Sequence, residues 1–323
     1  MYKIISHNDL DGYGSAYIVK RNLMTSGISE DMILVINTDY SKELNLDDFD
    51  KDDILFITDF SLKPDVMNVL QQKGLKNITW IDHHKTAIDY KQDYLYNENI
   101  LGLQEVGISA TGLAWIYFNA PDDIKKMGVE QQEQWLSVSA PKWVNLIDAW
   151  DCWKLNSKYR EESEYLNIAI GNILSYKLIE RLYDDKYLNS YIKKGRIYTE
   201  YMEKYDESYL NSCKYEITIN IINHKAYSGI VINRKACGSK AFGKELSKYD
   251  FGVSYVSDGE KIKASIYSTN PEFDCSKVCK VLGGGGHKGA AGFILDWSDL
   301  NLYEYFHKDA EWVLKIDNWE EDD

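Results

Sequence analysis

The chain has 323 residues, of which 44% are hydrophobic and 27% are charged. This length exceeds what one hydrophobic core usually organises, so we expect two domains. The formal net charge of -14 argues against a protein that holds long nucleic acid mainly by its phosphate backbone, because such binding needs a basic track that releases counterions. A short or small phosphorylated substrate fits better, since bound divalent cations can supply positive potential locally.

The amino-terminal segment MYKIISHNDLDG has neither a basic leader nor a long apolar stretch, and no run of about eighteen apolar residues occurs in the sequence. We therefore expect a cytoplasmic protein that does not associate with a membrane. The five cysteines form no C-x-x-C pair, so neither disulfides nor a cysteine zinc site is expected.

The first third of the chain alternates short β-rich runs with amphipathic segments. The predicted strands are 2–6, 32–36, 54–58 and 78–81, and the predicted helices are 13–25 and 62–73. Nearly continuous apolar strands that alternate with helices are typical of a parallel sheet covered on both faces. Two further helices are predicted at 109–119 and 131–150.

The pattern changes twice after about residue 160. It is first helical and strongly charged up to about residue 210, which favours a connector over a core. Beyond it the predicted strands are 214–222, 225–233, 250–257 and 261–268, the predicted helices are 238–248 and 274–282, and a glycine loop, GGGGHKGAAGF, follows at 283–293. We predict an α/β fold with a parallel-sheet domain over 1–155, a helical connector over 156–212 and a smaller α/β domain over 213–323.

Three of the predicted strands in the first domain end in polar clusters. The clusters are H-N-D-L-D-G at 7–12, Asp59, and D-H-H at 82–84. Ligands of open parallel sheets bind outside the carboxyl ends of the strands, so the three clusters are expected to converge on one crevice. Gly12 lets the backbone turn sharply into the following helix.

Imidazoles and carboxylates without a thiolate suit borderline-hard divalent ions such as manganese, and five or six such ligands are enough for two metals. The period-two spacing of His7, Asp9 and Asp11 places all three on the same side if the chain stays extended. His83 and His84 cannot point the same way along a strand, so we expect one to bind metal while the other faces substrate.

Each cluster alone has an ordinary structural explanation. An isolated H-N-D-L-D-G is more often a turn or a helix cap than a metal site, because Asn and Asp are common turn formers. A single aspartate carries almost no information, whereas adjacent histidines at a strand end have no packing reason to recur. Three such clusters at successive strand ends are hard to produce by turn chemistry, which favours the metal site.

Four motifs carry a resemblance to a known family. They are H-N-D-L-D-G, the Asp59 strand end, W-I-D-H-H-K and G-G-G-G-H-K-G-A-A-G-F, and in this order they resemble the DHH phosphoesterases that carry the DHH-associated carboxy-terminal domain. The resemblance covers nearly the whole chain and is strongest to the oligoribonuclease branch called nanoRNase B. It implies an active site in the cleft between the two domains, with two Mn²⁺ ions. The implied ligands are His7, Asp9 and Asp59 for one ion and Asp11, Asp59, His83 and an aspartate of the fourth motif for the other.

The fourth motif of the family corresponds to V-N-L-I-D-A-W-D-C-W, which offers Asp148 and Asp151. Helical spacing of three places both on nearly the same face. We favour Asp151 because it is nearer the helix end, while Asp148 stays open. Trp150 and Trp153 are expected to be packing residues more than base-stacking platforms.

The resemblance also suggests roles in catalysis. His84, when it is not a ligand, would contact the scissile phosphate or help to protonate the leaving oxygen. Asp82 would orient a neighbouring histidine. No serine or cysteine nucleophile is required.

The glycine loop has amide groups that can form an anion-binding nest, although a flexible hairpin is the ordinary alternative. The resemblance implies that the loop binds substrate through Gly285, Gly286, His287 and Lys288. Related domains frequently carry an arginine in a Ser-x-Arg-Ser strand before the loop, whereas this chain has Tyr267. Tyrosine can donate a hydrogen bond or stack on a base but cannot bind a phosphate bidentately, so Arg234 or Lys288 would have to compensate.

Together these expectations describe a manganese-dependent phosphodiesterase, with Mg²⁺ as an alternative ion. It would hydrolyse short RNA or DNA oligonucleotides or dinucleotides to nucleoside monophosphates with water activated by two metals. A cyclic-nucleotide phosphodiesterase and a RecJ-like single-strand-specific DNA exonuclease stay open as alternatives. An inorganic pyrophosphatase is disfavoured because those enzymes resemble a different second domain, and a non-catalytic nucleotide sensor would have lost metal ligands. The sequence leaves homodimer formation open.

Overall fold

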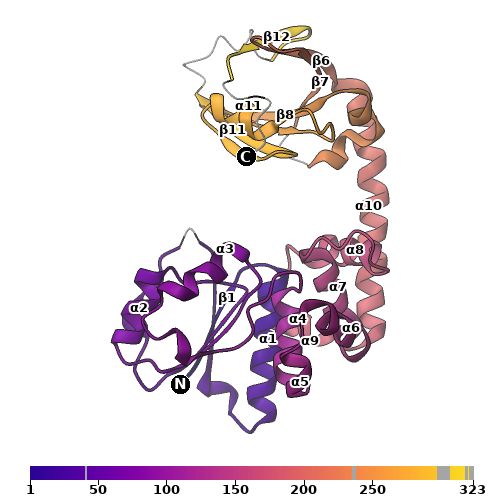
Figure 1. The fold of residues 1–323 in the computed structure, drawn as a ribbon. Coiled ribbons are helices and arrows are strands. Elements are labelled where there is room, and N and C mark those ends of the chain that lie inside the picture. The colour runs from indigo at the N-terminus through magenta and orange to yellow at the C-terminus, as the bar shows by residue number, and fades with distance from the viewer. Residues whose placement is uncertain (41, 235–237, 297–305, 317–318, 320–323) are drawn as a thin grey trace. The chain divides into compact units, whose positions relative to one another are not determined.

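The computed structural model describes residues 1–40, 42–234, 238–296, 306–316 and 319. The chain divides into two compact units, Met1–Thr199 and Glu200–Asp323 (Figure 1). No helix among the described residues is both long and apolar enough to cross a membrane.

The first unit contains a five-stranded parallel sheet with the order β2-β1-β3-β4-β5. The strands are β1 (Tyr2–His7), β2 (Ile33–Thr38), β3 (Ile54–Thr58), β4 (Asn77–Ile81) and β5 (Ile100–Leu101). The predicted parallel sheet is therefore confirmed. The chain leaves β1 for β2 on one side and then fills the other side from β3 onward, so the topological switch lies between β1 and β3. In folds of this kind the switch point is where ligands bind.

Helices cover both faces of this sheet, with α1 and α2 on opposite sides (Figure 1). Side chains of each central strand alternate between the two faces, because successive residues of a strand point to opposite sides. In β1, Ile4 packs on the α1 side and Ile5 on the α2 side. Both faces are buried, which explains why these strands are nearly continuous apolar runs.

The helices of the first unit are α1 (Leu10–Thr25), α2 (Pro64–Gln72), α3 (Lys85–Ile88), α4 (Ala110–Asn119), α5 (Asp122–Lys125), α6 (Val129–Ser139), α7 (Lys142–Asp151), α8 (Arg160–Ile170), α9 (Tyr176–Arg181) and α10 (Asp185–Cys213), with 3₁₀ turns at Glu30–Met32, Leu46–Asp48, Asp89–Asp93 and Asn97–Asn99. The helices predicted at 13–25, 62–73 and 109–119 are present as α1, α2 and α4, and the structure adds helices such as α3 and α5 that the sequence did not predict. The single helix predicted for 131–150 is wrong. Pro141 caps α7 in an extended conformation, and proline disfavours a helical residue before it, so the segment forms two helices.

Part of the predicted connector contributes to the core of the first unit. Leu166 and Ile170 of α8, Ile179 of α9 and Leu188 of α10 are buried in one cluster with α4 and α7. Helix α10 continues across the division between the two units. The domain limits drawn from the sequence remain a prediction.

The second unit contains a seven-stranded mixed sheet with the order β10-β11-β9-β8-β7-β6-β12. The strands are β6 (Tyr215–Ile221), β7 (Ala226–Asn233), β8 (Phe251–Ser257), β9 (Lys261–Tyr267), β10 (Gly285–His287), β11 (Ala290–Asp296) and β12 (Ala310–Leu314), and helix α11 spans Cys275–Val281. The buried side chains of α11 include Cys275 and Cys279, and both thiols are unpaired. The fifth cysteine of the sequence, Cys237, lies outside the described residues.

Two predictions for the second unit need correction. The helix expected at 238–248 is a pair of 3₁₀ turns over Ser239–Lys248, because Gly243 adopts φ 51° and breaks the helix. The glycine run expected as a loop is instead the hairpin of β10 and β11. At Gly286 the backbone has φ 145°, and a Cβ atom would lie 2.6 Å from the Cα atom of Ala291. Glycine is thus required there by strand pairing itself.

A buried ion pair joins the first two central strands of the first unit. The Nζ atom of Lys3 in β1 lies 2.6 Å from the Oδ2 atom of Asp53, which precedes β3, and their side chains are only 7% and 4% exposed. Burial acts to raise the pKa of Asp53, but hydrogen bonds from Lys3 and from the Asp50 N–H lower it to about 2.

We expect Asp53→Asn to lower the free energy of unfolding by about 2 kcal/mol at neutral pH, because the native pKa lies below its ordinary value. The folded pKa is depressed, so this stabilisation is fully present above the ordinary pKa of 3.8 and is lost as the pH falls towards 2. Urea unfolding at several pH values measures the difference. As a control, Asp47→Asn in the exposed Lys73–Asp47 pair should change stability by less than about 1 kcal/mol. Equal losses for both variants, or a loss independent of pH, would contradict the assignment.

Candidate metal centre

The first predicted cluster lies where β1 passes into α1. His7 ends the strand, Asp9 caps the helix by accepting a 2.9 Å hydrogen bond from the Gly12 N–H, and Asp11 lies in the first helical turn. The chain does not stay extended over 7–11, because the cap starts the helix at Leu10, so the condition for the period-two spacing is not met. A Cβ atom on Gly12 would lie 2.1 Å from the backbone oxygen of His7, so glycine serves the close contact of helix and strand more than a sharp turn.

His7 and Asp9 form a close pair. The Nδ1 atom of His7 lies 2.6 Å from Oδ2 of Asp9 and 3.9 Å from Oδ2 of Asp59. The hydrogen bond to Asp9 raises the pKa of His7. Burial acts to raise the pKa of Asp9, but the hydrogen bonds from His7 and Gly12 lower it.

Asp11 is fixed by the start of a second helix. Its two carboxylate oxygens accept hydrogen bonds from the backbone N–H groups of Ala110, at 2.7 Å, and Thr111, at 2.8 Å. The Thr111 hydroxyl also donates to the backbone oxygen of Asp11 at 3.0 Å. Free N–H groups at a helix start stabilise a negative charge, so α4 holds this carboxylate in place.

Asp59 lies at the centre of the predicted residues. It follows β3 with φ 52°, a left-handed conformation that is costly for a residue other than glycine and that often persists at functional sites. Its side chain is 2% exposed, and its Oδ1 atom lies 3.4 Å from Nε2 of His83. Burial, and then the neighbouring carboxylates of Asp11 and Asp9, raise the pKa of Asp59 well above its usual range.

The third cluster follows β4, and both of its histidines face Asp59. The Nδ1 atom of His84 lies 3.9 Å from Oδ1 of Asp59, and the two imidazole rings are 4.5 Å apart. The argument that His83 and His84 cannot point the same way along a strand does not apply, because β4 ends at Ile81. The division of roles between the two histidines stays a prediction. The Oδ1 atom of Asp82 lies 2.8 Å from Nδ1 of His84, and this hydrogen bond raises the pKa of His84.

The two aspartates of α7 differ in what they contact. Asp148 is buried, accepts a 2.8 Å hydrogen bond from the Ser109 N–H and lies 2.6 Å from Nζ of Lys154. Asp151 places its Oδ2 atom 3.1 Å from Nε2 of His83. Burial, and then the carboxylates near it, raise the pKa of Asp151 to about 8. Asp151 therefore points towards the other predicted ligands, and Asp148 is occupied by structural contacts.

Two side chains that the sequence did not single out also lie beside this site. The Sγ atom of Cys152 is 3.9 Å from Nδ1 of His83, and burial raises the pKa of this thiol. The Tyr40 ring lies 5.9 Å from the His7 ring. Cys152 directly follows Asp151 in the fourth motif, so its position was a signal that could have found it, whereas Tyr40 belongs to none of the four motifs and reaches the site only through the tertiary fold.

The donor atoms fit divalent cations. In each of three groups of residues, the donor atoms lie within 4.8 Å of one another. The groups are His7, Asp9 and Asp59; Asp59, His83 and His84; and His83, Asp151 and Cys152. The Nε2 atom of His83 is buried without a hydrogen-bond partner although three carboxylates lie within 3.1 to 3.7 Å. A cation among these groups would satisfy the imidazole and relieve the repulsion of the buried carboxylates.

The predicted substrate-binding residues belong to the second unit. Gly285, Gly286, His287 and Lys288 are all exposed there. The Tyr267 hydroxyl accepts a 3.3 Å hydrogen bond from the Gly238 N–H, and Arg234 is paired with Asp206 of α10.

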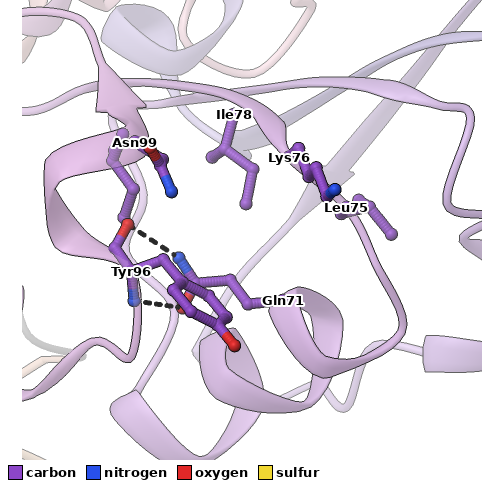
Figure 2. Close-up of a pocket in the computed structure, with 7 residues that line it drawn as sticks. Gln71, Leu75, Lys76, Ile78, Tyr96 and Asn99 are labelled. Atoms are coloured by element: carbon purple, nitrogen blue, oxygen red, sulfur yellow. Dashed lines mark hydrogen bonds between the residues drawn. The ribbon is translucent and has the colours of Figure 1, made fainter.

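A pocket of about 380 Å³ in the first unit lies elsewhere (Figure 2). It is lined by residues before and at the start of β4, such as Lys76 and Ile78, and by Tyr96. These positions are at the amino end of the strands, opposite the metal centre, and none of the predicted site residues lines the pocket.

Comparison with known proteins agrees with this picture. No family model matches the chain. The chain is 24% identical over 340 aligned residues to oligoribonuclease NrnB of Bacillus subtilis, which covers 96% of this chain and 76% of that protein. It is 26% identical over 328 residues to the uncharacterised protein R106 of Acanthamoeba polyphaga mimivirus, covering 95% and 72%. Its fold is similar to that of the pGpG-specific phosphodiesterase PggH of Vibrio cholerae, with a TM-score of 0.50 and 12% identity over 93% of this chain and 95% of the other.

The relative along nearly the whole chain, the sheet order and the cluster of His and Asp donors all agree with the four motifs. The chain is therefore similar to the DHH phosphoesterase superfamily along nearly its whole length. It is accordingly a hydrolase of phosphoester bonds.

The contacts of α7 predict different effects for its two aspartates. Asp151→Asn should weaken Mn²⁺ binding by more than about tenfold, because it removes a charged donor from the centre. Asp148→Asn should keep the Mn²⁺ affinity within about threefold and lower the free energy of unfolding by about 1 to 3 kcal/mol, because the buried ion pair with Lys154 is lost and only its more exposed pair with Glu133 stays. Calorimetric titration with Mn²⁺ and urea unfolding separate the two effects. The reverse pattern would identify Asp148 as the ligand.

Proposed function

We propose that this chain is a two-metal phosphodiesterase that hydrolyses short oligonucleotides and dinucleotides to nucleoside monophosphates. The observation that carries the proposal is the convergence of His7, Asp59, His83 and Asp151 at the switch point of the parallel sheet. The relative in Bacillus subtilis, an oligoribonuclease by name, supports the choice of substrate. The net charge of -14 supports a short substrate over a long one.

The proposed ligands divide between two Mn²⁺ ions, and Mg²⁺ is an alternative. One ion would be held by His7, Asp9 and Asp59, and the other by Asp11, Asp59, His83 and Asp151. When bound, such ions supply Lewis-acid stabilisation of the phosphate and activate water for attack. Asp59 suits the shared position, because its two oxygens face different histidines, His7 and His83.

His84 is proposed to act on the substrate directly. Its Nδ1 atom is held by Asp82 at 2.8 Å, and its side chain is more exposed than that of His83. The hydrogen bond to Asp82 raises the pKa of His84. A protonated His84 can donate a hydrogen bond to the scissile phosphate and pass the proton to the leaving oxygen.

The exposed residues of the β10–β11 hairpin are proposed to bind the substrate. The side chains of His287 and Lys288 carry hydrogen-bond donors, and Gly285 and Gly286 beside them are exposed and have no side chain that would keep an anion away from the backbone. This role follows from the family resemblance together with the exposure of the hairpin.

A substrate panel tests the proposal. With Mn²⁺ present, a dinucleotide and a pentanucleotide RNA should release nucleoside monophosphate faster than a long single-stranded DNA, and 3′,5′-cyclic AMP and pyrophosphate should react least. Asp59→Ala should reduce turnover by more than about a hundredfold. A preference for cyclic AMP or for long DNA would replace the proposal with a cyclic-nucleotide phosphodiesterase or a RecJ-like exonuclease, and cleavage of pyrophosphate alone would contradict it.

His287→Ala should raise KM for the dinucleotide about tenfold while kcat stays within about threefold, because a donor to a charged phosphate is lost without change at the metal centre. His307→Ala is the matched control in the same unit, since the His307 ring is bound to the backbone oxygen of Lys308. Steady-state kinetics measures both variants. An unchanged KM for His287→Ala would remove the hairpin from the proposed site.

A further inference from the structure

Tyr40 is an exposed aromatic residue at the carboxyl end of the sheet. It follows β2, its side chain is 57% exposed, and its ring lies 5.9 Å from the ring of His7. A single exposed tyrosine is common on protein surfaces. This one differs because it lies beside a predicted metal ligand and is held there by specific contacts.

Two residues, Phe60 and Ser61, hold the ring of Tyr40 in place. Tyr40 stacks on Phe60 with the ring centroids 4.6 Å apart and the planes at 22°. Its hydroxyl lies 3.3 Å from Oγ of Ser61. Phe60 and Ser61 are buried and directly follow Asp59 in the chain. The segment that positions the central carboxylate therefore also positions the tyrosine ring.

We propose that Tyr40 is a nucleobase-stacking subsite of the metal centre, on which the base of a bound nucleotide lies while its phosphate occupies the site beside His7. The inference rests on the proposed function and adds the feature of the substrate that this part of the chain recognises. A ring already held by Phe60 and Ser61 loses little freedom when a base stacks on it, which favours binding.

The surroundings favour a base over other ligands. Carboxylate oxygens of Asp9 and Asp59 lie 2.6 and 3.9 Å from Nδ1 of His7, and the neutral ring of Tyr40 next to this histidine offers no positive charge to a second phosphate. Every base has a π face, so stacking of this kind tolerates any base sequence. The subsite therefore distinguishes nucleotides from other phosphoesters without selecting among the bases.

Trp153 is the competing candidate, because it is 60% exposed and follows Asp151 closely. Its ring lies against the guanidinium of Arg160 at 4.2 Å and near the ring of Trp150 at 5.9 Å. Trp153 thus contacts residues close to it in the sequence that are not predicted metal ligands, whereas the Tyr40 ring contacts the ring of His7, which is a predicted ligand.

Binding of two probes to the whole chain with Mn²⁺ tests the subsite. AMP carries a base, and ribose 5-phosphate is the same phosphosugar without one. The wild-type protein should bind AMP about tenfold or more tightly than ribose 5-phosphate. Tyr40→Leu, which still covers Phe60, should remove most of this difference and leave binding of ribose 5-phosphate within about twofold, whereas Tyr40→Phe should retain the difference.

Tyr96→Leu is the matched control. Tyr96 is 50% exposed in the same unit but lies at the amino end of the strands, where Gln71 bonds only its backbone atoms (Figure 2). It should leave both affinities unchanged. Calorimetry gives the affinities, and thermal unfolding confirms that each variant is folded.

The outcomes are distinct. Equal binding of the two probes by the wild-type protein, an unchanged preference for AMP in Tyr40→Leu, or loss of that preference in Trp153→Ala alone would each overturn the subsite. Failure of the wild-type protein to cleave dinucleotides would overturn the proposed function while the AMP preference still decides the role of Tyr40.

Discussion

The structure depends on holding several carboxylates close together in a buried place. Asp11, Asp59 and Asp151 all lie within 3.7 Å of one imidazole nitrogen, that of His83. Like charges at such separations repel strongly where water is excluded, which is why burial and neighbouring carboxylates raise the pKa values of Asp59 and Asp151. The rest of the first unit is the framework that keeps these candidate cation ligands together.

That framework uses helix starts and strand ends. Asp9 caps α1, and Asp11 accepts two N–H groups from the start of α4, so both carboxylates are held by backbone donors. Asp59 is held by strand geometry instead, since its N–H bonds to the oxygen of Ile81 at 3.0 Å across to β4. His83 follows the end of β4 by two residues, so the same strand also positions this imidazole. The centre is thus built on regular elements, which fix ligand positions better than long loops do.

The sequence predicted the first sheet and the convergence of its clusters because these depend on local signals: apolar runs, their alternation with helices, and polar residues where strands end. It failed where a residue acts through its context. Pro141 divides a segment that otherwise reads as one helix, and Gly286 is required by a neighbouring strand that the glycine pattern did not reveal. The approach of Tyr40 to His7 and of Cys152 to His83 joins segments far apart in the chain, and single-sequence patterns carry no information on such contacts.

The proposed function assigns hydrolysis and the choice of substrate to different parts of the chain. The His and Asp donors at the switch point suit hydrolysis of a phosphoester bond in a substrate of any length, so they say little about how long the substrate is. Under the proposed function, charge would limit the length of the substrate, because a polyanion that extends beyond the bound cations meets a protein of net charge -14. Each phosphate beyond the centre adds repulsion that only local donors can offset. The proposed preference for short substrates therefore requires no steric barrier to long ones, because the net negative charge of the chain already disfavours their binding.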